Sequence, residues 1–82
     1  MGTPMPVVTL FRGDAFYFVA LIEDTDTVAT VGEKCAQHAV GRRIPPREVP
    51  LTVEYDGRVL DPEQSAVDAG IAPMGTVYVS YP

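Results

Sequence analysis

The sequence predicts an α+β fold in which a mixed sheet of four to five strands packs on one main helix. Short runs rich in β-branched and aromatic residues lie on both sides of a single stretch with helical periodicity. Two glycine turns, Arg12-Gly13-Asp14 and Asp56-Gly57, join four of these runs into hairpins. The expected order is strand, strand, helix, strand, strand, a short helical piece and a final strand.

The first hairpin has an unusual second strand. We expect residues 1–6 to be an extended N-terminal segment and residues 7–82 to form a single domain, which begins with a strand at 7–11. The run 15–22 has no charged residue and is apolar on both sides. Because strand side chains alternate, the run splits into a core face of Phe16, Phe18, Ala20 and Ile22 and an outer face of Tyr17, Val19 and Leu21. A small two-layer domain covers one face, so we expect a partner to bury the outer face; a strand at the sheet centre is the alternative.

A helix is predicted after the turn at 23–27, where Asp26 or Thr27 can cap its first turn. Its apolar residues recur at helical spacing and form a narrow stripe. We expect the helix to end near Arg42-Arg43, because Gly41 weakens the last turns and Pro45-Pro46 prevents continuation. The stripe consists of Val28, Val31, Cys35 and Ala39.

The C-terminal half predicts the second hairpin and the last strand. Residues 51–55 and 58–60 alternate as strands on either side of the turn at 56–57. A short helical piece is expected at 64–68, and Gly70 is suited to its C-terminal cap. Residues 76–81 read as the final strand.

Composition excludes several classes of protein. With 82 residues and a net charge of −5, the chain is one small acidic domain, which argues against nucleic acid as a partner. A single cysteine indicates a reducing compartment. No signal peptide and no apolar run long enough for a membrane span are recognisable, so we expect a cytoplasmic protein with no membrane contact.

Catalytic chemistry is not expected in this chain. Cys35 and His38 are one helical turn apart, but no third group or oxyanion pocket accompanies them. Cys35 lies in the apolar stripe and is interpreted as a core residue, and His38 as a structural or interface residue. No ligand set for zinc or an iron–sulfur cluster and no phosphate-binding glycine loop are present, so we expect no catalytic, cofactor-binding or metal-binding residues.

Positive charge is concentrated at one corner. Four of the six Lys and Arg residues lie between positions 34 and 47. Arg42, Arg43 and Arg47, with Glu48 beside them, flank a proline-stiffened segment, and arginine pairs well with carboxylates at interfaces. We interpret this corner as a docking surface, and a solvated loop is the alternative.

The element order is that of the β-grasp fold, and short strings resemble ubiquitin in the same order. These strings are Asp26-Thr27-Val28, Ile44-Pro45-Pro46 and Tyr55-Asp56-Gly57-Arg58-Val59-Leu60. The resemblance implies a ubiquitin-like fold. The last strand ends at the end of this sequence without a Gly-Gly tail, so conjugation chemistry is not expected.

A narrower resemblance involves the helix end and the loop after it. The string Glu33-Lys34-x-Ala36-x-His38-x-Val40-x-Arg42-Arg43-x-x-Pro46-Arg47-Glu48, together with Ala69-Gly70-Ile71-x-Pro73, resembles the gamma subunit of bacterial multicomponent monooxygenases of the toluene, alkene and isoprene group.

The resemblance implies a non-catalytic subunit of a hydroxylase built as a dimer of alpha-beta-gamma protomers. In that family a di-iron centre in the alpha subunit activates O2 to hydroxylate or epoxidise an apolar hydrocarbon. Electrons come from NADH through a reductase and a Rieske ferredoxin, and an effector protein tunes the site. The expected contacts with alpha are Arg42, Arg43, Arg47, Glu48, His38, Tyr17, Val19 and Leu21. The rival interpretation is a free-standing ubiquitin-like adaptor.

Overall fold

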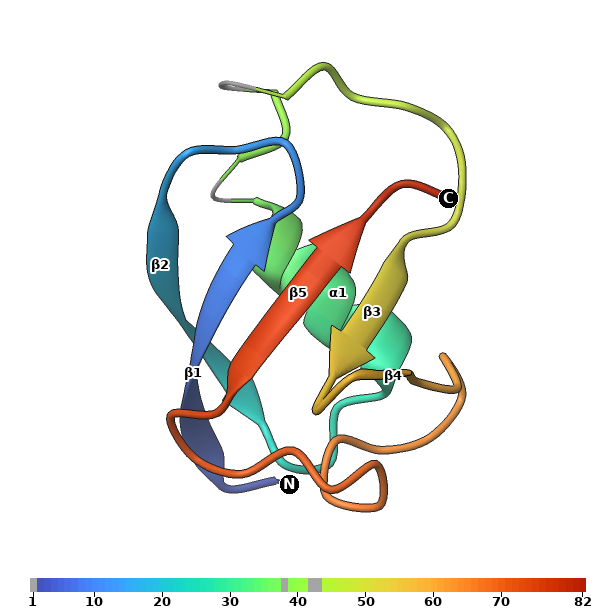
Figure 1. Ribbon diagram of the computed structural model, residues 1–82. Helices are drawn as coiled ribbons and strands as arrows, with labels where there is room; N and C mark the ends of the chain where they lie inside the picture. The colour runs from blue at the N-terminus through green and yellow to red at the C-terminus, as the bar shows by residue number, and fades with distance from the viewer. Residues whose placement is uncertain (1, 38, 42–43) are drawn as a thin grey trace.

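The computed structural model describes residues 2–37, 39–41 and 44–82. A five-stranded mixed sheet has the order β2-β1-β5-β3-β4, in which β1 and β5 are parallel and the other neighbours are antiparallel. Helix α1 crosses one face of this sheet diagonally (Figure 1). The elements are β1 (Pro4–Phe11), β2 (Tyr17–Glu23), α1 (Val28–Ala36), β3 (Thr52–Tyr55), β4 (Arg58–Val59) and β5 (Thr76–Ser80). The predicted α+β architecture is thereby confirmed.

Strand β1 begins at Pro4 and not at Val7 as expected. Its two prolines are tolerated because their nitrogens point to a side where β1 makes no ladder hydrogen bond at these positions. The N–H of Val8 points toward the β5 side, where it donates to Gly75 O at 3.0 Å. Pro4 and Pro6 share this direction, since alternate residues of a strand point the same way. Strand β5 starts only opposite Val8, so the missing N–H groups of the two prolines cost no ladder bond.

The core lies between α1 and the inner face of the sheet. Val7, Ile22, Val28 and Val31 are completely or almost completely buried there. Cys35 is 2% exposed among them, which agrees with its interpretation as a core residue. Burial of these apolar side chains is the main stabilising contribution in a domain of this size.

Helix α1 ends at Ala36, and the prediction that it continues to Arg42-Arg43 was wrong about its length. The N–H groups of both Ala39 and Val40 donate to Ala36 O, at 3.0 and 2.8 Å, which tightens and closes the last turn. Gly41 then adopts a φ of +80°, which favours glycine. The chain folds back, and Gly41 N–H donates to Ile44 O at 2.8 Å.

The segment 64–68 forms turns and not the short helix that was expected. The carbonyl groups of its first residue and of the turn before it accept hydrogen bonds from α1 instead. Val28 N–H donates to Gln64 O at 2.7 Å and Ala29 N–H donates to Pro62 O at 3.0 Å. These bonds satisfy N–H groups that the first turn of a helix leaves unpaired. Residues 62–64 thereby cap the N-terminal end of α1.

The helix cap was predicted as Asp26 or Thr27, and the structure shows Thr27, whose hydroxyl accepts from Thr30 N. Asp26 has another role. Its Oδ2 accepts from Glu23 N–H at 3.0 Å and from Lys34 Nζ at 2.6 Å. Its carbonyl also accepts from Ala66 N–H at 2.7 Å. Asp26 therefore connects the end of β2, helix α1 and the segment 64–68.

We expect Asp26→Asn to lower the free energy of unfolding by about 1–2 kcal/mol at pH 7, since a charged hydrogen bond is lost. Burial raises the pKa of Asp26, but the hydrogen bonds from Lys34 and Glu23 outweigh it and the net pKa is lowered. A lowered folded-state pKa contributes stability above the unfolded value of about 4, and this contribution disappears as pH falls. Urea unfolding from pH 7 to pH 2 should show the two proteins converge, whereas Glu63→Gln should match the wild type throughout.

Phe16 was assigned to the core face, and this assignment was wrong. Its side chain is 57% exposed, whereas Ala20 and Ile22 on the same side are 2% and 0% exposed. Phe16 precedes β2 and stacks edge-on with Phe18 at a centroid distance of 6.5 Å. The buried residues of β2 are Ala20 and Ile22, so the core extends under the later part of the strand and not under this end.

Candidate interaction surfaces

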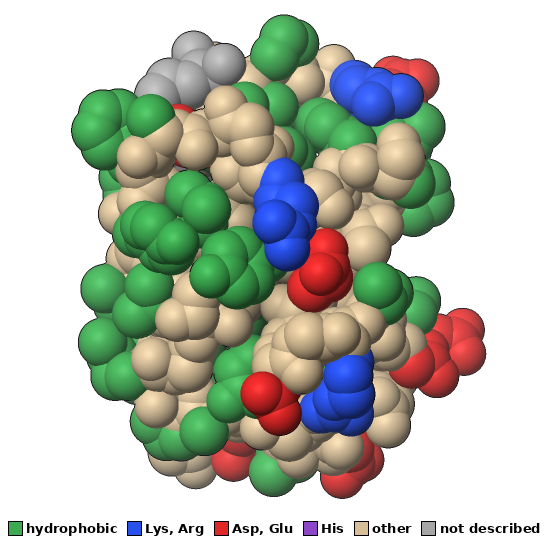
Figure 2. All heavy atoms as spheres, in the orientation of Figure 1, with side chains coloured by type: hydrophobic (Ala, Val, Ile, Leu, Met, Phe, Trp, Pro, Cys, Tyr) green, Lys and Arg blue, Asp and Glu red, His purple; other side chains and the backbone are tan. Residues whose placement is uncertain are grey.

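The outer face of β1 and β2 carries a continuous set of exposed or half-buried apolar side chains, which we call the apolar sheet face. Tyr17, Val19 and Leu21 are 57%, 57% and 66% exposed. The register places each of them directly opposite an apolar residue of β1. In Figure 2, which views the sheet from the side opposite α1, hydrophobic side chains gather over these two strands. The apolar sheet face consists of Pro6, Val8, Leu10, Tyr17, Val19 and Leu21.

The structure therefore confirms that the second strand is apolar on both sides and that the chain itself leaves one side open. The β1 members of this face, Val8 and Leu10, were not among the predicted site residues. The signal was present in the sequence, because residues 7–11 read Val-Val-Thr-Leu-Phe and place apolar groups on both sides of the strand.

Polar contacts mark the boundary of the apolar sheet face. The Arg12 guanidinium lies 3.2 Å from Glu54 Oε1 and 4.8 Å from the centre of the Tyr78 ring. A side-chain hydrogen bond with Tyr78 is the main cause that raises the pKa of Tyr17. The half of the sheet formed by β5 and β3 is thus charged and hydrogen-bonded, and the other half is apolar.

The predicted basic corner is described only in part. His38, Arg42 and Arg43 lie outside the described residues. Arg47 and Glu48 are exposed on the loop that leads to β3. Arg47 N–H donates to the Tyr81 hydroxyl at 3.0 Å, and its guanidinium lies 5.2 Å from the centre of the Tyr81 ring. Tyr81 in turn stacks edge-on with buried Phe11, so the loop is anchored to the sheet.

The position of Arg47 relative to the apolar sheet face follows from the strand order. The loop enters β3, but Arg47 lies over Tyr81, which directly follows β5, and β5 is the neighbour of β1. One strand spacing, about 5 Å, separates β5 from β1, the nearer strand of the apolar sheet face. A partner can therefore contact Arg47 and the apolar sheet face through one continuous surface.

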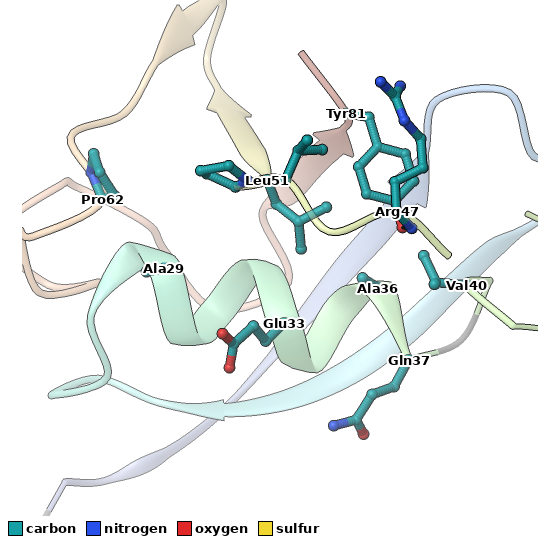
Figure 3. Close-up of a pocket in the computed structure, with 11 residues that line it drawn as sticks. Ala29, Glu33, Ala36, Gln37, Val40, Arg47, Leu51, Pro62 and Tyr81 are labelled. Carbon is teal, nitrogen blue, oxygen red and sulfur yellow. Dashed lines mark hydrogen bonds between the residues drawn. The ribbon is translucent and has the colours of Figure 1, made fainter. Parts of the chain in front are cut away.

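A groove of about 550 Å³ lies beside α1, under the loop at 47–51 (Figure 3). Sequence reasoning did not anticipate it. Small residues of the helix make room for it, and Figure 3 shows Ala29 and Ala36 on the helix side with Leu51 and Tyr81 facing them. The groove is lined by Ala29, Glu33, Ala36, Gln37, Val40, Arg47, Val49, Pro50, Leu51, Pro62 and Tyr81.

Cys35, the candidate nucleophile of the sequence, is buried in the core. Burial raises the pKa of the Cys35 thiol, which opposes formation of a thiolate, and the nearby Thr9 hydroxyl lowers it by less. That hydroxyl is buried without a hydrogen bond of good geometry to any described residue, and the thiol is the polar group it faces. Within residues 2–37, 39–41 and 44–82, no three His, Cys, Asp or Glu side chains gather as a metal site. No described helix is long and apolar enough to cross a membrane.

Comparison with known sequences identifies related proteins. The family described as "Toluene-4-monooxygenase system protein B (TmoB)" matches residues 4–81. A curated relative from Xanthobacter autotrophicus, the gamma subunit of the oxygenase component of an alkene monooxygenase system, is 38% identical over 58 residues. The aligned region covers 68% of this chain and 66% of that relative.

Comparison with solved structures places the fold among ubiquitin-like proteins. A chain from a toluene 4-monooxygenase HD complex with the inhibitor 4-bromobenzoate has a TM-score of 0.91 at 24% identity, covering 98% of this chain and all of that one. The ubiquitin-like domain of Plasmodium falciparum Dsk2 has a TM-score of 0.73 at 20% identity, again over 98% of this chain and all of the other. The predicted ubiquitin-like β-grasp fold is thereby confirmed.

Proposed function

This chain belongs to the family of toluene-4-monooxygenase system protein B, and we propose that it is the non-catalytic gamma subunit of a bacterial multicomponent monooxygenase hydroxylase. The observation that carries the proposal beyond the family is the apolar sheet face. Its three β2 side chains are each more than half exposed, which is costly for a small protein that functions alone. A permanent partner would remove this surface from water.

The proposed partner is the large alpha subunit, in a dimer of alpha-beta-gamma protomers. The apolar sheet face would supply the buried centre of the contact, because large hydrophobic patches with a polar rim are typical of obligate interfaces. Arg47 and Glu48 are proposed as charged rim contacts, with His38, Arg42 and Arg43 beside them in the sequence. The same system would contain a beta subunit, an effector protein and a Rieske ferredoxin, in the cytoplasm.

The reaction belongs to the partner. We propose that the alpha subunit holds a di-iron centre and uses O2 to hydroxylate or epoxidise an apolar hydrocarbon. The substrate is either toluene or an alkene such as isoprene. The described residues of this chain gather no ligand set for iron, so no step of the reaction is assigned to them. Its contribution would be to support the fold and assembly of alpha.

The proposal is tested by mild affinity purification of this chain from its native host, followed by mass spectrometry and an iron assay. We expect recovery at one-to-one stoichiometry with a large iron-containing chain. Recovery of the chain alone, or with varied iron-free partners, would favour the free-standing ubiquitin-like adaptor and contradict the subunit proposal.

The charged rim is tested separately by Arg47→Glu. We expect this reversal to weaken assembly by about tenfold. In the proposed contact Arg47 pairs with a carboxylate of alpha, and the new glutamate would instead repel that carboxylate. The fold should be retained, since the bond from Arg47 N–H to the Tyr81 hydroxyl uses the main chain and only the contact of the guanidinium with the Tyr81 ring is lost. Arg58→Glu, on exposed β4, is the charge-matched control. Because the Arg58 guanidinium also donates to Ala69 O at 3.4 Å, the thermal unfolding of both variants is compared before binding is measured. Equal binding by both variants, measured by titration of alpha, would exclude Arg47 from the interface.

A further inference from the structure

Strand β2 forms one edge of the sheet, and its main-chain direction can be assigned from the hydrogen bonds at its C-terminal end. Asp24 N–H donates to Thr3 O at 3.1 Å, across the β1–β2 pair. Glu23 N–H points the other way and donates to Asp26 Oδ2 at 3.0 Å. Because main-chain direction alternates along a strand, even-numbered residues of β2 face β1 and odd-numbered residues face away from the sheet.

The main-chain groups that point outward belong to the same residues as the exposed apolar side chains. These are Tyr17, Val19 and Leu21. Their N–H groups donate to no main-chain or side-chain acceptor among the described residues outside the β1–β2 ladder, in contrast to Glu23, which Asp26 satisfies. Each of the three therefore offers a donor, an acceptor and an apolar side chain along one edge.

The two edges of the sheet are treated differently. Strand β4, at the opposite edge, has only two residues, Arg58 and Val59. Short edge strands and strands with lysine or proline resist pairing with other chains. Strand β2 has seven residues and contains neither lysine nor proline. One edge is thus protected against strand addition and the other is not.

Charge indicates the chemistry of the occupant. The C-terminal end of β2 is acidic, with Glu23 exposed and Asp24 following it. Lys34, the nearby cation, is already paired with Asp26. Two copies of this chain would each bring a net charge of −5 to the contact, which opposes self-pairing. A segment with basic residues near Glu23 is favoured instead.

We propose that the β2 edge is a strand-addition site for an extended segment of the larger hydroxylase subunit. That segment pairs with the main chain of Tyr17, Val19 and Leu21. Its alternate side chains are apolar and continue the apolar sheet face, and a basic residue lies beside Glu23. This inference rests on the proposed function for the identity of the partner, and adds the mode of binding.

Amide hydrogen exchange in the assembled complex tests the pairing. The complex is exchanged in D2O, quenched and dissociated, and individual amides of this chain are read by NMR in an aprotic solvent. In the free chain we expect Phe18, Ala20 and Ile22 to be protected and Tyr17, Val19 and Leu21 to exchange quickly. In the complex the odd-numbered amides should slow by about 100-fold or more, as in a regular ladder.

A backbone variant isolates the hydrogen bond from the side chain. Cys35 permits native ligation of synthetic segments 1–34 and 35–82, so Val19 can carry an N-methyl group without any change in side chain. We expect assembly to weaken by about tenfold. N-methylation of Val59 is the matched control, because Leu60 N–H faces β3 and that of Val59 therefore points away from the opposite edge. It should bind normally.

The outcomes separate the two proposals. A complex in which Tyr17, Val19 and Leu21 exchange as fast as in the free chain overturns strand addition and leaves the subunit function intact. Concentration-dependent protection of these amides in the isolated chain identifies a second copy as the occupant and also overturns it. Failure of the unmodified chain to bind alpha overturns the proposed function, and this inference with it.

Discussion

Leu21→Lys is expected to weaken assembly with the hydroxylase by about 100-fold. Burying a leucine side chain contributes about 1.5–3 kcal/mol, and the substitution replaces this with an ammonium group that must lose water. In the free chain Leu21 is 66% exposed and followed two positions later by Glu23 on the same face. A lysine there is well tolerated, and lysine on an edge strand reduces aggregation.

The measurement is a titration of the alpha subunit, combined with thermal unfolding of the free chain. The matched control is Val59→Lys, since Val59 is 69% exposed and lies on β4, at the opposite edge of the sheet from β2. We expect the control to bind as the wild type does. Normal assembly of Leu21→Lys with unchanged affinity would exclude the apolar sheet face from the interface.

Ile22→Ala is expected to have the largest effect on stability. Ile22 is next to Leu21 in the chain but is 0% exposed, under α1. Truncation of a buried isoleucine costs about 2–5 kcal/mol, whereas a domain of this length has a total free energy of unfolding of about 4–12 kcal/mol. We expect the midpoint of thermal unfolding to fall by more than about 10 °C.

Leu21→Ala is the matched comparison, because it removes a side chain of the same size from the adjacent position. Its effect on the stability of the free chain should be within about 0.5 kcal/mol, as for other exposed sites. Circular dichroism melts of the three proteins would measure the difference. Equal destabilisation by both substitutions would contradict the assignment of one residue to the core and the other to a contact surface.

Much of the fold could be predicted from local patterns. Alternation marked the strands, and Gly13 and Gly57 both have the positive φ that their turns required. The apolar run at 15–22 already indicated that one side of β2 lacks a covering layer. The run has more apolar side chains than the one buried face of a strand can hold. These features depend on neighbouring residues, so the sequence contains them directly.

The start of α1 and the state of residues 64–68 depend on tertiary contacts. Val28 N–H donates to Gln64 O, Ala29 N–H donates to Pro62 O, and Ala66 N–H donates to Asp26 O. Local propensity does not include such partners. The end of α1 has a local cause, because Ala39 and Val40 N–H both donate to Ala36 O and Val40 then pairs with Ile44.

The sequence by itself determined that β2 carries apolar residues on both sides. It also determined the cluster of arginines after the helix, which carries the resemblance to the family. Only the tertiary structure decided that β2 lies at an edge of the sheet, with the main chain of Tyr17, Val19 and Leu21 directed outward. It also decided that Arg47 lies over Tyr81 at the end of β5 and that its loop covers a groove beside α1. Strand order depends on pairings between residues far apart in the chain, and local patterns carry no information about which strand is left without a neighbour.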